Sequence, residues 1–307
     1  ADIIVSSGAK QCLFNALSAI LDPGDEVLLP SPCWVSYPEM VRMAGGVPVM
    51  VKGDEANGFL VDADALRPHV TERTKALILN SPNNPSGSVC SRALLEGIAA
   101  LAVEKQFYVI SDEIYEKLIY DGEAHVSIAS LGDEIRAQTI VVNGVSKSYA
   151  MTGWRIGYAA GPKAVIRAMT AFQSHSTSNP NSIAQHAAAV ALTNGEKFMH
   201  DSLVEFDARR RLMHQLISEI PGLSAALPKG AFYMMLNISA LIGKSLNGRA
   251  IRGSDDFAEM LLESQKVAVV PARAFGDDRY VRLSYATSRD KITLGLARIA
   301  EFVKELE

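Results

Sequence analysis

Short apolar runs alternate with segments of helical periodicity through the first two thirds of this 307-residue chain. This alternation is typical of a parallel sheet whose strands are joined by helical crossovers. Several runs are wholly apolar, as expected for strands that are covered on both faces. The predicted strands are Val27–Leu29, Val47–Val51, Ala76–Asn80, Phe107–Ser111, Thr139–Asn143 and Ile156–Ala160. The predicted fold class is therefore α/β, with a mostly parallel sheet sandwiched by helices.

The pattern changes after the sixth strand. Helices are expected over 181–193 and 196–220, and the run Arg209-Arg210-Arg211 within the second helix is interpreted as a solvated face. The elements predicted beyond it are strands over 231–236, 267–270 and 280–285, a helix over 255–265, and a final helix that Ser288 could cap. We therefore expect a large domain over 1–208 and a smaller α+β domain over 209–307.

Composition excludes several classes of function. Thirty Lys and Arg residues against 34 Asp and Glu give a net charge of −4, without a basic block, so neither nucleic-acid binding nor attachment to a membrane surface is expected. No apolar run approaches the roughly 20 residues of a spanning helix. Cys12, Cys33 and Cys90 are odd in number and lack metal-ligand spacing, so we expect no structural metal and a cytoplasmic location.

Polar residues follow three of the predicted strands where each strand ends. The strand over 76–80 leads to Asn84, the next leads to Asp112 and Tyr115, and a third leads to Lys147. Because ligands of such sheets lie beyond the carboxyl ends of the strands, one shared polar ligand is expected. Taken singly, Asp112 could be a helix cap and Lys147 a surface residue.

Two features predict an anion site. The backbone N–H groups of Gly8, Ala9 and Lys10 stand at the positive end of the first predicted helix. Arg155, eight residues after Lys147, could grip a phosphate through its bidentate fork, with a surface ion pair as the alternative. Neither a G-x-G-x-x-G fingerprint nor a P-loop occurs.

Six motifs, in this order, resemble the class I pyridoxal-phosphate-dependent aminotransferases of fold type I. They are Ser-Gly-Ala-Lys, Ser-Pro-Cys-Trp, Asn-Ser-Pro-Asn-Asn-Pro-Ser-Gly, Ser-Asp-Glu-Ile-Tyr, Val-Ser-Lys and Gly-Trp-Arg-Ile-Gly. The resemblance covers essentially the whole chain and is closest to bacterial aspartate aminotransferases with a Gly-x-Lys-Gln loop. It implies transamination between an amino acid, aspartate or glutamate, and a 2-oxo acid such as 2-oxoglutarate or oxaloacetate.

The resemblance also implies roles for single residues toward pyridoxal 5'-phosphate. Lys147 would hold the cofactor covalently and then act as base, which requires a lowered pKa of its amine. Asp112 would keep the ring nitrogen protonated. Tyr115 and Asn84 would donate to the phenolic oxygen, and Trp34 would stack on the ring.

The remaining implied roles concern anionic groups. The phosphate would be held by Gly8, Ala9, Lys10, Ser146 and Arg155. Arg282, on an otherwise apolar strand, would clamp the substrate α-carboxylate beside Trp34 and Asn84. An unpaired buried charge is expensive, so a carboxylate partner is needed, and a buried Asp or Glu is the alternative to substrate. Lys10 would reach the distal carboxylate of aspartate or glutamate, or else be a solvated residue or a phosphate ligand.

The chain departs from the family pattern in places. Cys33 replaces a common tyrosine, and Tyr37 stands where some relatives carry a histidine near the ring-nitrogen carboxylate. The family segment before the phosphate loop is not assigned here, so a fragment, or a chain whose ordered part begins at Ala1, is expected, with its own competence in question. The family further implies a homodimer in which Ser178 and Asn179 lie near the partner's site.

Other functions remain open from the sequence. Within the fold these are an aromatic, prephenate or alanine aminotransferase, or a β-lyase, and Lys10 is the discriminating residue. Outside the fold, the chain could be a non-catalytic cofactor-binding domain of a transcription regulator, although neither a helix-turn-helix nor a basic segment is visible in this sequence. A nicotinamide-dependent oxidoreductase is a further alternative, although the phosphate loop of that class does not occur in this sequence.

Overall fold

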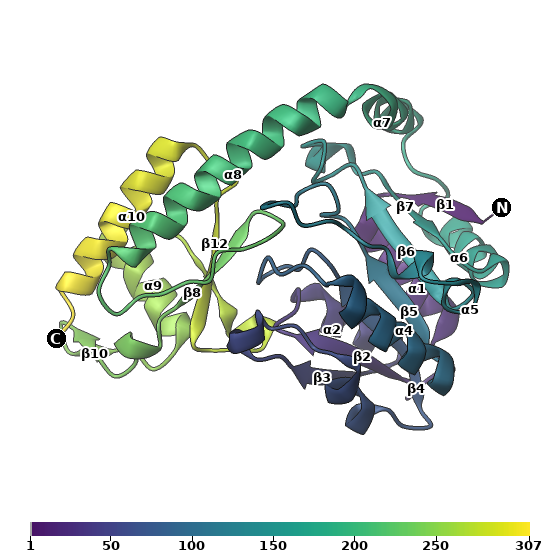
Figure 1. Cartoon of the computed structure of the whole chain (residues 1–307), viewed down its shortest axis with the longest axis horizontal. Helices are drawn as coiled ribbons and strands as arrows, with labels where there is room; N and C mark the ends of the chain where they lie inside the picture. Colours follow the sequence, from purple (N-terminus) through teal and green to yellow (C-terminus); the bar gives the residue numbers. More distant parts are fainter. Residues whose placement is uncertain (1) are drawn as a thin grey trace.

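A seven-stranded sheet forms the larger part of the computed structural model, which describes residues 2–307 (Figure 1). From edge to edge its strands are β1 (Ile3–Ser6), β7 (Gly157–Ala160), β6 (Thr139–Gly144), β5 (Tyr108–Asp112), β4 (Thr74–Asn80), β2 (Glu26–Ser31) and β3 (Val47–Lys52). The strands from β6 to β3 are parallel, whereas β7 and β1 are antiparallel to their neighbours. The prediction of a mostly parallel sheet is confirmed, although β1 was not predicted.

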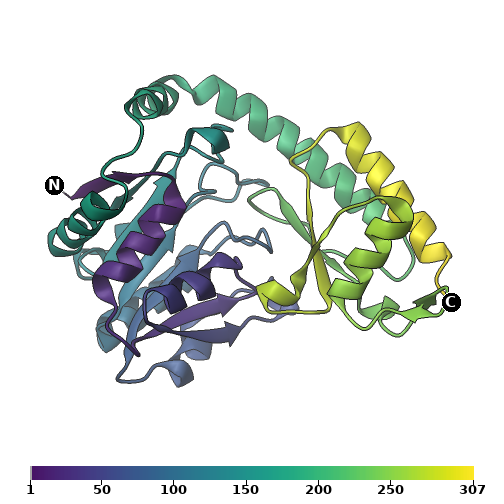
Figure 2. The ribbon, with the colours of Figure 1, turned by 180° about the vertical axis from the view of Figure 1, so that it is seen from behind.

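Helices cover both faces of this sheet, as a comparison of Figures 1 and 2 shows. Successive side chains of a strand point to opposite faces. Ile78 of β4 accordingly joins the core under α1, α2 and α6, and Leu77 joins the core under α3, α4 and α5. These helices are α1 (Ala9–Ile20), α2 (Ser36–Met43), α6 (Lys163–Ser176), α3 (Ala63–Leu66), α4 (Arg92–Lys105) and α5 (Asp133–Arg136).

The C-terminal part is an α+β unit with its own apolar core. Its antiparallel sheet has the order β11 (Val270–Pro271), β12 (Tyr280–Ser284) and β8 (Tyr233–Asn237). Around it lie α9 (Ser254–Gln265), α10 (Arg289–Lys304) and the hairpin of β9 (Ser245–Leu246) and β10 (Arg249–Ala250). The strand predicted over 267–270 is wrong except at its end: Val267 and Val269 pack on the core, and the ladder with β12 begins at Val270.

Single helical turns complete the connections. They are η1 (Glu55–Asn57), η2 (Arg67–His69), η3 (Ile128–Ser130), η4 (Thr152–Trp154), η5 (Ser239–Leu241) and η6 (Ala272–Phe275). Among residues 2–307, no helix has the length and apolar character that crossing a membrane requires.

The long helix α8 (Glu196–Ser218) follows α7 (Ser182–Asn194) and runs from the large sheet to the C-terminal unit (Figure 1). Met213 and Ile217, in its second half, belong to the core of that unit. The boundary predicted near Arg209 remains a prediction, and this packing supports it.

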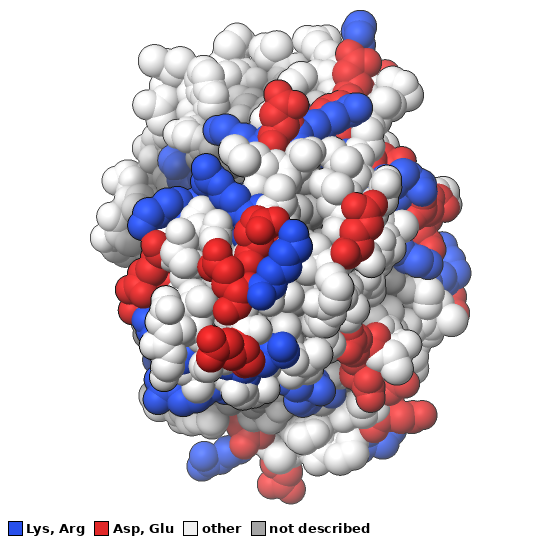
Figure 3. Space-filling model, turned by 90° about the vertical axis from the view of Figure 1, so that its left-hand side faces the viewer, with Lys and Arg blue, Asp and Glu red and all other residues white. Residues whose placement is uncertain are grey.

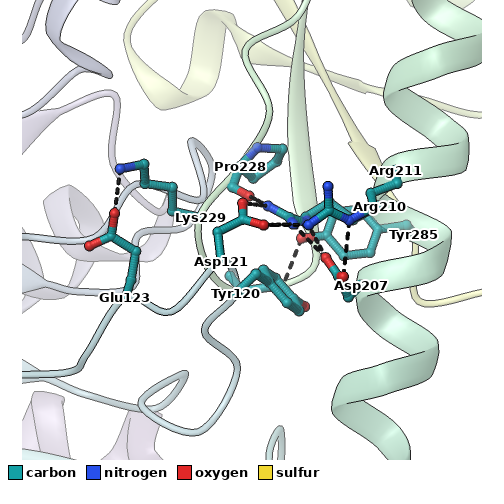
Figure 4. Close-up of polar contacts among 10 residues, drawn as sticks. Tyr120, Asp121, Glu123, Asp207, Arg210, Arg211, Pro228, Lys229 and Tyr285 are labelled. Carbon is teal, nitrogen blue, oxygen red and sulfur yellow. Dashed lines mark hydrogen bonds and ion pairs between the residues drawn. The ribbon is translucent and has the colours of Figure 1, made fainter.

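Arg210 anchors α8 to the large domain (Figure 4). The guanidinium donates to both carboxylate oxygens of Asp121, at 2.7 and 2.8 Å, and to the carbonyl of Pro228 at 2.6 Å. It also pairs with Asp207 and lies 4.6 Å from the ring centroid of Tyr120. Its side chain is 0% exposed. The prediction that the arginine run is a solvated face is therefore wrong at Arg210, because Asp121, which lies in a loop, pairs with this arginine and helps to bury it.

Acidic and basic side chains are interspersed over the face shown in Figure 3. Exposed ion pairs of the C-terminal unit include Arg252 with Asp256 at 2.9 Å and Arg249 with Glu263 at 3.2 Å. Pairs at such exposed positions contribute little to stability, about 0–1 kcal/mol each. They do, however, balance the local charge.

Candidate active site

A cavity of about 340 Å³ lies beyond the carboxyl ends of β4, β5 and β6, where β8 and β12 of the C-terminal unit close it. Every residue predicted to bind cofactor or substrate lines it, except Gly8. Those that line it are Ala9, Lys10, Trp34, Asn84, Asp112, Tyr115, Ser146, Lys147, Arg155 and Arg282. Parallel strands bring their carboxyl ends to one edge, so residues distant in sequence meet here.

Asp112 is the last residue of β5 and is 3% exposed. One carboxylate oxygen accepts a hydrogen bond from the Tyr37 hydroxyl at 2.7 Å, and the other accepts from the backbone N–H of Ile114 at 3.2 Å. Burial raises the pKa of Asp112 to about 6, although the Tyr37 hydrogen bond opposes this. The site therefore contains a buried acid with no cation of residues 2–307 in direct contact.

Lys147 follows β6 and reaches the same cavity. Burial lowers the pKa of its amine, and the positive charges of Arg155 and Arg282 lower it further, against the opposite effect of Asp112. The role implied for Lys147 by the family resemblance requires a pKa lowered in this direction. The amine nitrogen also lies 5.7 Å from the ring centroid of Phe232. A larger neutral fraction makes this amine a better nucleophile and base.

The start of α1 and Arg155 lie together at one part of the cavity. Gly8 has φ 92°, a backbone conformation that favours glycine, and a Cβ atom there would lie 2.3 Å from a guanidinium nitrogen of Arg155. Arg155 donates to the carbonyl of Thr152 at 2.9 Å and forms no ion pair with a carboxylate of residues 2–307. The N–H of Gly8 donates to the carbonyl of Ser6 at 2.7 Å, and the role of Gly8 in an anion site remains a prediction.

Arg282 projects from β12 without a buried Asp or Glu of residues 2–307, the partner that the sequence left open as the alternative to a substrate carboxylate. Within residues 2–307 it forms no ion pair, and its Nε is buried without a hydrogen-bond partner. One terminal nitrogen donates to the side-chain oxygen of Asn84 at 2.8 Å. The guanidinium carbon lies 4.3 Å from the ring centroid of Tyr233 and 4.9 Å from that of Phe275. Rings and an amide thus hold a cation whose remaining donors are left for a ligand, and burial lowers its pKa.

Lys10 and Trp34 lie together at the cavity. The ammonium nitrogen of Lys10 is 4.7 Å from the Trp34 ring centroid, and Trp34 packs edge-on against Tyr37 at 5.4 Å. Lys10 is exposed and pairs with no carboxylate of residues 2–307.

The cavity therefore has an excess of positive charge. Its lining contains the four basic residues Lys10, Lys147, Arg155 and Arg282 and the single acid Asp112. None of the four forms an ion pair within the described chain, in contrast to the balanced surface pairs. Such a field favours ligands that carry several negative charges.

Sequence reasoning assigned no binding role to six of the residues that line the cavity, which are Leu13, Tyr37, Asn80, Ile114, Thr152 and Tyr233. Asn80 donates to the backbone carbonyl of Asp112 at 2.9 Å and so joins two strand ends. Tyr233 begins β8, and an aromatic residue in an apolar strand gives no signal that separates a cavity wall from a core. Ser178 and Asn179 do not line the cavity, and their role near a partner remains a prediction.

A second cluster lies outside the cavity. Ligand atoms of Glu113, Glu116 and His125 lie within 4.8 Å of one another. The Glu113 carboxylate already accepts hydrogen bonds from Ser111 at 2.9 Å and Ser127 at 2.7 Å, and it meets the His125 ring at 2.9 Å. These internal contacts account for the cluster, and we assign no metal to it.

Comparisons with a family model, with related sequences and with solved structures agree with one another over nearly the whole chain. A family model described as aminotransferase class I and II matches residues 1–299. An aspartate aminotransferase of Geobacillus stearothermophilus is 46% identical over 99% of this chain and 76% of its own length. An aspartate/prephenate aminotransferase of Thermus thermophilus is 48% identical over 97% of this chain and 74% of its own. The crystal structure of the Rhizobium meliloti aspartate aminotransferase has a TM-score of 0.96 and 42% identity, covering 100% of this chain and 77% of that one.

Proposed function

Because the chain belongs to the class I and II aminotransferase family, whose members use pyridoxal 5'-phosphate, we propose that it transfers the amino group between aspartate or glutamate and a 2-oxo dicarboxylic acid. One observation carries this choice. Arg282 and Lys10 both line the cavity, and neither pairs with a carboxylate of residues 2–307. A substrate with two carboxylates would supply both missing partners, and the names of the relatives support the same substrate class.

The residues present fit the cofactor. The buried, hydrogen-bonded Asp112 suits a protonated ring nitrogen, and the partly buried Lys147 suits an aldehyde. Ser146, Arg155 and the first N–H groups of α1, which have no partner within the helix, suit a phosphate. The volume of about 340 Å³ lies in the usual range for a small-molecule site.

When bound, the cofactor supplies a carbonyl carbon for the amino group and a ring that accepts electrons. Lys147 takes the proton from the substrate Cα and returns one in the second half-reaction. Asp112 keeps the proton on the ring nitrogen, while Tyr115 and Asn84 donate toward the ring's phenolic oxygen. The indole ring of Trp34, together with β8 and β12 of the C-terminal unit, excludes water from the reacting atoms.

Two basic residues orient the substrate in this proposal. Arg282 binds the α-carboxylate through its free donors, and Lys10 binds the distal carboxylate. Fixing both ends of the molecule orients the Cα–H bond that Lys147 must reach.

We also propose a cytoplasmic homodimer, with Ser178 and Asn179 near the partner's phosphate. Three buried free cysteines support a reducing compartment. Trp154, 48% exposed, and Ile183, 74% exposed, line a surface hollow that also includes Arg155. Exposed apolar groups beside a binding site are typical of a surface that another protein covers.

A panel of amino donors and oxo acids tests the proposed function. We expect turnover with aspartate and glutamate, and the panel includes alanine, phenylalanine and prephenate because relatives and alternatives point to them. Lys10→Met should raise KM for aspartate about tenfold, since an exposed charge pair contributes only about 1 kcal/mol or somewhat more. KM for alanine should stay within about twofold.

Lys163→Met is the matched control, because Lys163 is an exposed lysine at the start of α6, away from the cavity. A rise of KM for alanine equal to that for aspartate would refute the role of Lys10. Turnover of phenylalanine without turnover of aspartate would replace the proposed substrate class by an aromatic one.

A further inference from the structure

Tyr233 joins the two functional ends of the cavity. Its hydroxyl oxygen lies 3.0 Å from that of Tyr115, and its ring lies 4.3 Å from the guanidinium carbon of Arg282. Resting on the proposed function, we propose that Tyr233 is a positioning residue that holds Arg282 through its ring and strengthens the hydrogen bond of Tyr115 to the cofactor through its hydroxyl. The two roles use different parts of one side chain and can be separated.

The ring role follows from the environment of Arg282. This guanidinium has no carboxylate partner within residues 2–307, and only the oxygen of Asn84 accepts from it, at 2.8 Å. Tyr233 and Phe275 lie at 4.3 and 4.9 Å from its carbon. A cation over an aromatic ring gains about 0.5–2 kcal/mol, more when water is excluded. The rings thus fix the guanidinium before any carboxylate arrives.

The hydroxyl role follows from counting hydrogen atoms. Each tyrosine hydroxyl has one hydrogen to donate. If Tyr115 donates its hydrogen to the phenolic oxygen of the cofactor, the bond between the two hydroxyls must use the hydrogen of Tyr233. Burial raises the pKa of Tyr115 well above its usual value, so the Tyr115 hydrogen remains in place. A donor that itself accepts a hydrogen bond is a stronger donor.

The turn before Tyr233 explains why a residue of the C-terminal unit reaches this position. Ala231 adopts a left-handed conformation, with φ 58°, and its N–H donates to the carbonyl of Leu118 in the large domain at 2.9 Å. Its carbonyl accepts from the hydroxyl of Tyr120 at 2.6 Å. A Cβ at Gly230 would lie 2.5 Å from Pro82, so the turn seats closely on the large domain. Tyr233 follows this fixed turn directly into the cavity.

Two variants of the holoenzyme separate the roles. Tyr233→Phe keeps the ring and removes the hydroxyl, and Tyr233→Leu removes both. The first readout is the pH midpoint of the visible absorbance of the bound cofactor. A donated hydrogen bond favours an ionised oxygen, so its weakening should raise this midpoint by about half a pH unit in both variants. The second readout is the dissociation constant of maleate, a dicarboxylate without an amino group. It should rise about tenfold in Tyr233→Leu and stay within about twofold in Tyr233→Phe.

Tyr280→Phe is the matched control, because Tyr280 is a buried tyrosine of the adjacent strand β12 that does not line the cavity. It should move neither readout. An unchanged absorbance midpoint in Tyr233→Phe would overturn the hydroxyl role, and equal maleate affinity in Tyr233→Leu and wild type would overturn the ring role. Neither readout needs turnover. A wild-type enzyme that does not transaminate aspartate would refute the proposed substrate while these comparisons still decide the role of Tyr233.

Discussion

Two arginines, the fully buried Arg210 and the partly buried Arg282, are compensated in opposite ways. Arg210 pairs with Asp121 and Asp207 and also donates to a backbone carbonyl (Figure 4). Arg282 has one amide oxygen and, within residues 2–307, no carboxylate. Both lie over a tyrosine ring, at 4.6 and 4.3 Å, so the aromatic contact does not distinguish them. The difference lies in the carboxylates.

This difference separates a structural cation from a binding cation. A buried charge is tolerated when its partners satisfy it, and it is costly when they do not. The fold supplies all the partners of Arg210, whose contacts join α8, the loop at Asp121 and the segment before β8. At Arg282 the fold supplies two aromatic rings and one amide oxygen but no carboxylate of residues 2–307. The missing anion must therefore come from a bound ligand. The comparison predicts that removing the two side chains affects different properties.

Arg282→Met should have the largest effect, and the effect should be on catalysis. Loss of the charge-assisted bonds to the α-carboxylate should lower kcat/KM for aspartate about a thousandfold, or about 4 kcal/mol. The thermal midpoint of the cofactor-free protein should stay the same or rise, because the variant buries no unpaired charge. Steady-state kinetics and calorimetry on the same preparation check both parts.

Arg282→Lys sharpens this prediction, because it keeps the charge and loses the planar fork. It should recover only part of the lost activity. A large loss of thermal stability in Arg282→Met would break the comparison, since it would make Arg282 a structural residue like Arg210.

Arg210→Met should act on stability instead. Removal of a buried partner from an ion-pair network lowers the free energy of unfolding by about 3 kcal/mol or more. Arg211→Ala is the matched control, because Arg211 contacts the same two aspartates but is 55% exposed, and its removal should cost about 1 kcal/mol or less. Denaturant titrations measure both. Equal losses in the two variants would show that burial does not set the difference.

The sequence predicted most of the site because strand ends of a parallel sheet must converge. Asp112 and Lys147 follow directly from that rule, and the family resemblance supplied Trp34 and Arg282. The surroundings of each arginine could not be predicted in this way. Arg210 is one of three consecutive arginines, and its burial against the Pro228 carbonyl and the Tyr120 ring makes it differ from Arg211, which contacts the same aspartates but is exposed.

Tyr233 and β1 were missed for a related reason. Nothing in an apolar strand distinguishes a tyrosine at a cavity from one in a core, because the difference depends on the turn at Ala231 and its contacts with Leu118. The run Ile3–Ser6 is short, and its antiparallel pairing with β7 joins segments about 150 residues apart. Partners at such separations follow from the completed fold rather than from local pattern.

Asp112 extends the comparison to a buried anion and gives the smallest predicted effect. Like Arg282, it has no direct partner of opposite charge in the part of the chain that the structure describes, and its pKa is raised to about 6 mainly by burial. A cationic ring nitrogen binds only the ionised form, so binding below pH 6 must first remove a proton from Asp112. Affinity for pyridoxine 5'-phosphate, which has no aldehyde to react with Lys147, should therefore fall by up to about tenfold for each pH unit below 6.

Two variants separate the effect of Asp112 protonation on affinity from the effect of protonation of the ligand itself. Asp112→Asn should bind more weakly at neutral pH and lose the added dependence, because no carboxyl remains to titrate. Tyr37→Phe removes a hydrogen bond that lowers the pKa of Asp112, so the onset of weakening should move to higher pH. Absorbance titrations between pH 4.5 and 8 supply the curves. If the affinities of wild type and Asp112→Asn changed with pH in parallel, Asp112 would already be ionised before the ligand binds. Asp112 would then differ from Arg282, because it would need no ligand to stabilise its charge.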